Sequence, residues 1–282
     1  MRVCLRLPAY SASAKVICFI GKLGQRDRCI SPEPGSLFQD FPSCDNEEDA
    51  IKSLAKIYAV PDKEIERILT HPDVVEIAKS DTELLSPYFP FVISMLLKSH
   101  PRYELTHAAY YHSTSYDGCP SWFDEGLLGS SAGIGCFIEK ISGLIPEEKR
   151  EAVVQESRRI VAFRSELEGS TAKGTGPYAW NTLAAASSSE NGIRYQVPEA
   201  IQDLWGRSLV GRGDLIDLSG VIREKLKPVV VKFKGATTDL DTYCSVLWGY
   251  LLSENGETHL THTFVGDGVG IPRESILAII DV

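Results

Sequence analysis

Short strand-like runs alternate with helical stretches of unequal length, and this irregular order constrains the fold more than any other feature of the chain. The apolar, β-branched run 228–234 is the clearest strand. Four further runs have the composition of strands: 103–112, 192–197, 258–265 and 276–282. Because strands and helices interleave with few regular βαβ units, the order favours an α+β domain over a doubly wound parallel sheet.

Residues 45–100 have the periodicity of a small helical module. Apolar side chains follow an acidic turn at helical spacing, and prolines then open further helices. The expected helices are 45–58, 61–69, 72–79 and 81–97. We therefore predict an irregular N-terminal segment with this helical module in residues 1–100, and a second domain in residues 101–282. The helices expected in the second domain are 120–128, 147–163 and 181–188.

The composition, 43% hydrophobic and 24% charged, is that of an ordinary globular protein. A net charge of −9 argues against a nucleic-acid binder that works through a broad basic surface. The seven cysteines form no CxxC pair, which is typical of reduced thiols and gives a zinc site no paired ligands. No apolar run approaches the roughly 20 residues of a membrane span, and no signal peptide is evident. We expect a cytoplasmic protein with no membrane segment and no metal.

His112 heads the first chemically suggestive segment. It follows two tyrosines at the end of the predicted strand 103–112 and precedes the hydroxyl residues Ser113 and Thr114. A short predicted helix then ends at Gly126 and Leu127. A lone histidine is more often a packing or surface residue. The neighbouring hydroxyl residues and the helix after them are what make His112 a candidate site residue.

The second segment contains Tyr178. Gly174 and Gly176 precede it, and an alanine-rich helix follows. An aromatic ring can stack on a planar, electron-poor pyridinium, and glycine lets a ligand approach the backbone closely. The plainer interpretation is a flexible loop that leads into a helix.

The third segment closes the chain with a strand, a loop, Ile271-Pro272 and a last strand. In this order the three segments resemble the NAD-dependent ADP-ribosyltransferases of the histidine–tyrosine–glutamate branch, which includes diphtheria-type toxins and poly(ADP-ribose) polymerases. Those proteins have His-Gly-Thr or His-Gly-Ser, a helix ending in Gly-Leu, a Gly-x-Gly-x-Tyr segment and a glutamate strand followed by a proline turn. The resemblance covers about residues 103–282 and implies a split antiparallel β-sheet core.

The resemblance also implies roles for individual residues, with NAD as the co-substrate. His112 would hold the adenosine-side ribose, the Ser113 backbone would bind the carboxamide, Tyr178 would stack on the nicotinamide and Ser187 would touch its amide. The full implied NAD-binding set is His112, Ser113, Thr114, Gly176, Tyr178 and Ser187, and the implied catalytic set is His112, Tyr178 and Glu257.

Two positions depart from the family pattern. Ser113 stands where the family has glycine, and the glutamate's place falls near Thr261 or His262, neither of which is a carboxylate. Glu257, at the start of the same strand, is the nearest acid. In this family the glutamate bonds the nicotinamide ribose and stabilises a developing cation. Its displacement therefore implies transfer of a single ADP-ribose unit rather than polymer synthesis.

The function implied is mono-ADP-ribosylation of a macromolecule, protein or nucleic acid, with release of nicotinamide. Such enzymes serve as effectors, toxins or defence proteins, resident in the cytoplasm or delivered into a host cell, and a neutralising or regulatory protein partner is a further expectation. Two alternatives remain open: a catalytically inactive relative that binds NAD, ADP-ribose or a protein, and an unrelated α+β interaction protein.

Other interpretations of single segments also remain. The arginine–serine–glutamate branch of the same superfamily has a hydroxyl signature like Ser113–Ser115, paired glutamates like Glu166 and Glu168, and a strand arginine, for which Arg102 is the nearby candidate. His259 and His262 lie three residues apart on a predicted strand, so they should point to opposite faces and hold no metal. The segment 239–241 is expected to be a solvated turn.

Overall fold

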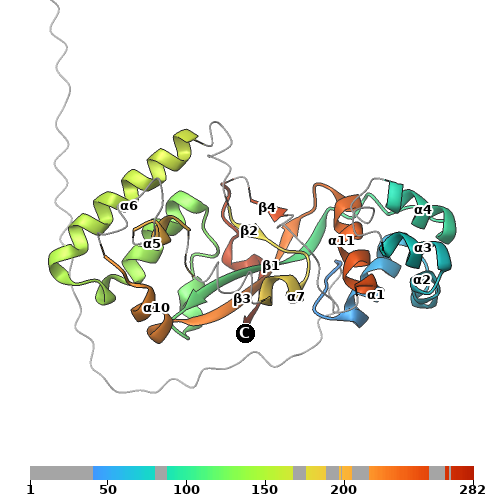
Figure 1. The fold of residues 1–282 in the computed structure, drawn as a ribbon, viewed down its shortest axis with the longest axis horizontal. Coiled ribbons are helices and arrows are strands. Elements are labelled where there is room, and N and C mark those ends of the chain that lie inside the picture. Colours follow the sequence, from blue (N-terminus) through green and yellow to red (C-terminus); the bar gives the residue numbers. More distant parts are fainter. Residues whose placement is uncertain are drawn as a thin grey trace, which may run out of the picture. The chain divides into compact units, whose positions relative to one another are not determined.

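The computed structural model describes residues 41–79, 88–167, 176–188, 197, 199–204, 216–253, 264–266 and 268–282. Helices and small antiparallel sheets are both present in these residues, which confirms the predicted α+β class (Figure 1). The described residues all belong to one compact unit, Gln39–Val282.

The larger described sheet has three strands in the order β1-β3-β5, and both neighbouring pairs are antiparallel. Its strands are β1 (His107–Tyr116), β3 (Lys227–Ala236) and β5 (Ile276–Asp281). The register of β1 on β3 places His112 opposite Val231 and Ser113 opposite Val230. The predicted strands 228–234 and 276–282 are therefore confirmed to within two residues at each end.

The second described sheet pairs β2 (Tyr178–Ala179) with β4 (Phe264–Val265), again antiparallel. A single bridge between Tyr111 and Trp180 connects β2 to β1, and each residue donates its amide to the other's carbonyl at 2.9 Å. Of the predicted strand 258–265, the structure describes only β4. The predicted strand 192–197 lies outside the described residues except for Val197, which is in a bend.

The predicted bounds of the first strand, 103–112, were wrong. Residues 103 and 104 form a turn, and the amide of Leu105 donates to the Arg102 carbonyl at 2.9 Å. The strand instead runs on through the hydroxyl residues, because its pairing with β3 continues as far as Tyr116, and Ser113 and Ser115 are buried. His112 therefore lies inside β1 and not at its end.

Helices occur at the four places predicted before residue 100: α1 (Glu47–Tyr58), α2 (Asp62–Leu69), α3 (Pro72–Ala78) and α4 (Tyr88–Leu97). Residues 81–87 of the predicted helix 81–97 lie outside the described residues. Asn46 caps α1 by accepting a hydrogen bond from the Asp49 amide at 3.0 Å. α1, α3 and α4 pack against α11 (Leu240–Leu252), and α2 packs against those three helices (Figure 1). Tyr58 and Trp248 lie in the same hydrophobic cluster as Phe233 of the sheet. The domain boundary predicted near residue 100 stays a prediction.

The segment 239–241 is not a solvated turn, because Asp239 caps α11. One oxygen of its carboxylate accepts the Thr242 amide at 2.9 Å, and the other accepts the Thr242 hydroxyl at 2.6 Å. Most of α11 is buried, from Tyr243 through Trp248 without a break. A helix that is apolar nearly all round has no polar face to reveal its period, so the sequence pattern did not predict it.

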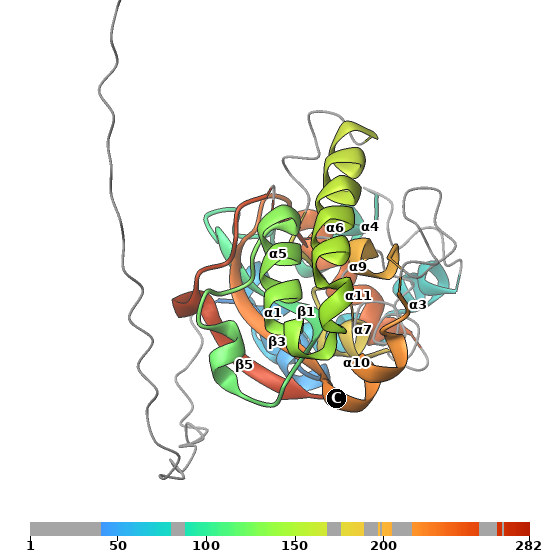
Figure 2. The ribbon, with the colours of Figure 1, turned by 90° about the vertical axis from the view of Figure 1, so that its left-hand side faces the viewer.

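Four more helices form a separate hydrophobic cluster: α5 (Ser130–Lys140), α6 (Glu147–Leu167), α9 (Glu199–Gln202) and α10 (Ser219–Lys225). α5 and α6 lie side by side (Figure 2). The predicted helix 147–163 is confirmed as α6. The predicted helix 120–128 is only a 3-10 turn, η1 (Pro120–Phe123), and 3-10 turns also occur at η2 (Ser142–Leu144) and η4 (Arg273–Ser275). The predicted helix 181–188 is α7 (Leu183–Ser187), capped by Thr182.

Candidate functional site

The three segments singled out in the sequence meet in space. Leu127, after the first segment, forms a bridge with Ile271 of the third, with amide-to-carbonyl distances of 2.9 and 2.7 Å. Gly266 donates its amide to the Pro177 carbonyl at 3.1 Å, which joins the third segment to the second. Segments that are distant in the chain thus lie next to each other in the fold.

Glycines allow this close approach. Gly126 has a φ of +79°, and a Cβ added there would lie 2.0 Å from the Ile271 carbonyl oxygen. A Cβ on Gly266 would lie 2.6 Å from Cδ of Pro177. No side chain fits at either position without movement of the neighbouring backbone or ring, so the contact between the segments depends on both glycines.

His112 contacts the tyrosine segment directly. Its Nδ1 lies 2.7 Å from the carbonyl oxygen of Tyr178. A carbonyl can only accept, so Nδ1 carries the proton and Nε2 is left as an acceptor in the neutral ring. Burial lowers the pKa of His112 below its ordinary value of 6.5, and the carbonyl contact opposes this shift only in part. The neutral form, with Nε2 free to accept, therefore dominates at neutral pH.

The backbone of Ser113 points away from β3. Tyr111, two residues earlier, directs its amide and carbonyl to Trp180, and Ala109 donates its amide to the Pro42 carbonyl on the same side. By the alternation of an antiparallel strand, the amide and carbonyl of Ser113 point to that side as well. The Ser113 side chain is buried, and its hydroxyl donates to the Ala186 carbonyl of α7.

Ser187 is the last residue of α7 and follows Ala186 directly. Its hydroxyl oxygen is buried and has no hydrogen-bond partner among the described residues. The small side chains Ala185 and Ala186 pack against Tyr111 in one hydrophobic cluster. Through its bond to the Ala186 carbonyl, the Ser113 side chain contacts the residue next to Ser187 in the chain.

The remaining predicted residues are less informative. Tyr178 is half-buried in β2 opposite Val265, and Thr114 is half-buried in β1 opposite Val229. Gly176 has a φ of +77°, and its carbonyl accepts the Gly268 amide at 3.2 Å. Glu257, the implied acid, lies outside the described residues, as do Thr261 and His262, at the family glutamate's place, and His259.

The arrangement also bears on the arginine–serine–glutamate alternative. Arg102 lies in the loop before β1, where its Nε bonds the Glu104 carboxylate at 2.7 Å, so it is not on a described strand. Glu166 belongs to α6, and Glu168 lies outside the described residues.

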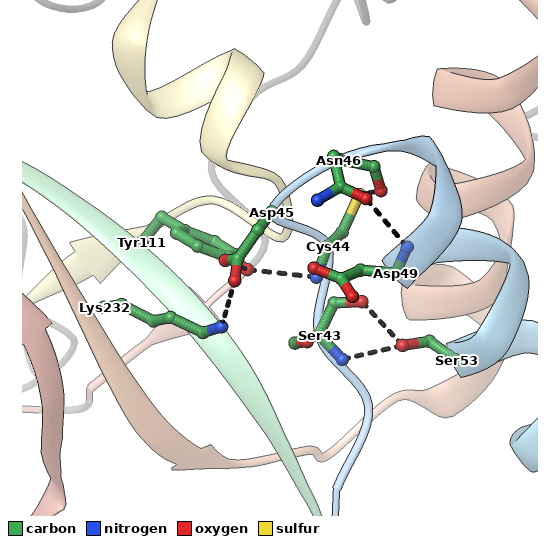
Figure 3. Close-up of polar contacts among 8 residues, drawn as sticks. All are labelled: Ser43, Cys44, Asp45, Asn46, Asp49, Ser53, Tyr111 and Lys232. Atoms are coloured by element: carbon green, nitrogen blue, oxygen red, sulfur yellow. Dashed lines mark hydrogen bonds and ion pairs between the residues drawn. The ribbon is translucent and has the colours of Figure 1, made fainter. Parts of the chain in front are cut away.

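One polar cluster was missed by the sequence analysis (Figure 3). The ammonium of Lys232 pairs with the Asp45 carboxylate at 2.6 Å, and the Tyr111 hydroxyl donates to the same carboxylate at 2.6 Å. The Lys232 side chain is only 4% exposed, whereas that of Asp45 is 33% exposed. The available signal was a lysine inside the apolar run 228–234, which indicates a buried charge that needs a partner.

This cluster fixes the segment before α1 against the sheet and α7. The Cys44 amide donates to the Tyr111 hydroxyl at 3.0 Å, and the Leu183 amide donates to the Cys44 carbonyl at 3.0 Å. Burial, followed by the nearby Asp45 charge, raises the pKa of Tyr111 well above its ordinary value. Tyr111 therefore remains a neutral hydrogen-bond donor.

Within the described ranges, no group of three or more His, Cys, Asp or Glu side chains could hold a metal ion. The helices described in the structure include none that is long and apolar enough to cross a membrane. Comparisons with protein-family models, with curated proteins and with solved structures gave no significant match.

Proposed function

We propose that this protein is an NAD-dependent mono-ADP-ribosyltransferase that uses NAD as co-substrate and transfers one ADP-ribose unit to a macromolecule. The observation that carries the proposal is the 2.7 Å contact between His112 Nδ1 and the Tyr178 carbonyl. It joins two residues, 66 positions apart, to which the family resemblance independently assigns NAD binding. The two small antiparallel sheets joined at Tyr111 and Trp180 agree with the split sheet of that family.

The polar groups beside α7 fit a primary carboxamide such as that of nicotinamide. A carboxamide needs a donor for its oxygen and acceptors for its NH₂ group. The Ser113 backbone offers an amide and a carbonyl pointing to one side of β1, and Ser187 offers a buried hydroxyl that lacks a partner among the described residues. A buried hydroxyl without a hydrogen-bond partner lowers the stability of the free protein. A ligand that forms a hydrogen bond with it removes this cost, and the affinity of the ligand rises accordingly.

His112 and Tyr178 would hold the sugar and the ring. The Nε2 atom of neutral His112 would accept a hydrogen bond from a ribose hydroxyl, and the Tyr178 ring would stack on the nicotinamide. When NAD is bound, departure of nicotinamide leaves the ribose carbon open to a nucleophile of the acceptor. Glu257 remains the proposed acid on the strand before β4.

The test measures both transfer and binding. Purified protein is incubated with NAD labelled in its ADP-ribose half and with a cell lysate, and the label is sought on protein and on RNA. Transfer that is lost in His112→Ala supports the enzyme. Binding of NAD by titration calorimetry, with neither transfer nor nicotinamide release, would instead establish a catalytically inactive NAD-binding protein. An enzyme of this kind would serve as an intracellular effector, toxin or defence protein.

A further inference from the structure

A cavity of about 690 Å³ lies between the first turn of α11, strand β4 and the loop that leads to Ile271. This volume falls within the range of about 300–1,000 Å³ typical of small-molecule sites. None of the seven residues assigned above to NAD or catalysis is among the described residues that line it. The cavity is therefore a second feature, separate from the proposed carboxamide site.

The cavity adjoins the NAD-binding residues. Tyr110 lines it and lies two positions before His112, so both side chains are on the same face of β1. Val265 also lines it and is the strand partner of Tyr178. A group held in this cavity would lie next to the residues proposed to bind NAD, which is where a transferase must place its acceptor.

The lining suits a long apolar stem that ends in a positive charge. Phe264 and the 45% exposed Val265 provide apolar wall. Asp239 provides a carboxylate, and hydrogen bonds from Thr242 lower the pKa of that carboxyl below its ordinary value, so it is ionised at neutral pH. Each Asp239 oxygen accepts one bond from Thr242, which leaves further lone pairs for a ligand. Lysine and arginine side chains combine such a stem with a cationic head.

Besides Asp239, the described lining holds the Lys234 ammonium, the His107 ring and the hydroxyls of Tyr110 and Tyr243. The Lys234 ammonium lies 5.6 Å from the centre of the Phe41 ring, and Phe41 does not line the cavity. The His107 Nδ1 lies 2.9 Å from the Thr106 hydroxyl. The chain as a whole carries a net charge of −9, which attracts a cationic partner and repels a phosphate backbone.

We infer that this cavity receives the arginine or lysine side chain of a protein acceptor, so that the acceptor is a basic segment of protein rather than a nucleic acid. The inference rests on the proposed transferase function for its biological meaning. Binding of such a side chain can be measured without NAD, so the two ideas can fail separately.

The probe is a blocked Gly-Ala-Arg-Ala-Gly peptide, compared with the same peptide carrying neutral citrulline in place of arginine. Binding is followed by nuclear magnetic resonance titration. The arginine peptide should bind more tightly than the citrulline peptide, and Asp239→Asn should weaken only the arginine peptide, by about two- to fivefold. Asparagine is as good a helix cap as aspartate, so α11 should keep its fold.

Asp217→Asn is the matched control, because Asp217 is an exposed aspartate that accepts the Ser219 amide at 2.8 Å near the start of α10 and does not line the cavity. It should leave binding unchanged. Equal binding of the two peptides, or equal weakening by both aspartate variants, would overturn the inference. So would a single-stranded oligonucleotide that binds more tightly than the peptide and is weakened by Lys234→Gln. If the protein binds the arginine peptide but releases no nicotinamide from NAD, the docking site is supported and the proposed transferase activity is contradicted.

Discussion

Two hydrogen-bonding groups, the ring of His112 and the hydroxyl of Ser187, decide whether the proposed pocket can work. The histidine is held with Nδ1 against the Tyr178 carbonyl, which leaves Nε2 for a ligand. The Ser187 hydroxyl is buried with no described partner. The pH dependence of stability tests the protonation of the His112 ring, and NAD affinity tests the role of the Ser187 hydroxyl.

The lowered pKa of His112 predicts a pH dependence of stability. The folded state keeps the ring neutral, whereas the unfolded chain takes up a proton as the pH falls through 6.5. The free energy of unfolding should therefore decrease as the pH falls below that value and level off below the lowered folded-state pKa. Urea unfolding at about pH 7.5 and about pH 5 should show a smaller loss for His112→Gln than for the native chain. Identical losses would show that His112 is not held neutral.

Ser187→Ala and Ser113→Ala should separate ligand binding from stability. The Ser187 change removes an unpaired hydroxyl, so stability should stay the same or rise by up to about 1 kcal/mol, while NAD affinity should fall by about two- to tenfold. The Ser113 change breaks the bond to the Ala186 carbonyl and should cost about 1 kcal/mol of stability. NAD affinity should change little in that variant, because the backbone of Ser113 is proposed to bind. Reversed effects would contradict these assignments.

At the scale of elements, the proposed site is assembled by contacts between segments that are distant in the chain. The Leu127–Ile271 bridge and the Gly266–Pro177 hydrogen bond bring the closing loop against the histidine and tyrosine segments. At the glycines of these contacts, one added methyl group should lower the stability of the fold strongly.

Gly126→Ala tests this assembly, with Gly135→Ala as its control. At Gly126 the φ of +79° and the 2.0 Å approach to the Ile271 oxygen should together cost more than about 2 kcal/mol of stability. At Gly135, inside α5, an added Cβ meets no atom within 4 Å, so alanine should stabilise by about 0.5–1 kcal/mol. Thermal unfolding measures both changes. A tolerated Gly126→Ala would show that the bridge does not define the fold.

The elements that the sequence could predict are those with a local pattern. The apolar, β-branched run 228–234 lies in β3, and the proline-opened helices were found where expected. β1 was displaced by several residues, because its pairing with β3 continues through Ser113 and Ser115, and the Ser113 hydroxyl has its acceptor on α7. α11 was missed, since a helix buried nearly all round shows no period.

At the scale of the whole molecule, the long-range polar contacts were beyond prediction. Lys232 and Asp45 are 187 residues apart, and nothing local to either indicates the other. The resemblance paired His112 with Tyr178 in function, but only the structure shows which atoms meet. The same ion pair joins the segment before α1 to β3 of the sheet.

Asp45→Asn and Lys232→Met should lower the stability of the fold by unequal amounts. The asparagine variant leaves the Lys232 charge buried without its counterion, which should cost about 2–3 kcal/mol given the partial exposure of Asp45. The methionine variant leaves Asp45 within reach of water and of the Tyr111 hydroxyl, so it should cost about 1 kcal/mol or less. Equal costs in chemical denaturation would indicate that the pair is solvated.

The most direct test of the proposed enzyme is the release of nicotinamide from NAD by the purified chain, measured by chromatography over time. The native chain should release nicotinamide catalytically. His112→Ala and Tyr178→Ala should each lower the rate by about a hundredfold or more, while Asp217→Asn, far from the site residues in the chain, should not change it. Absence of release from the native chain, or release that survives both site substitutions, would contradict the account.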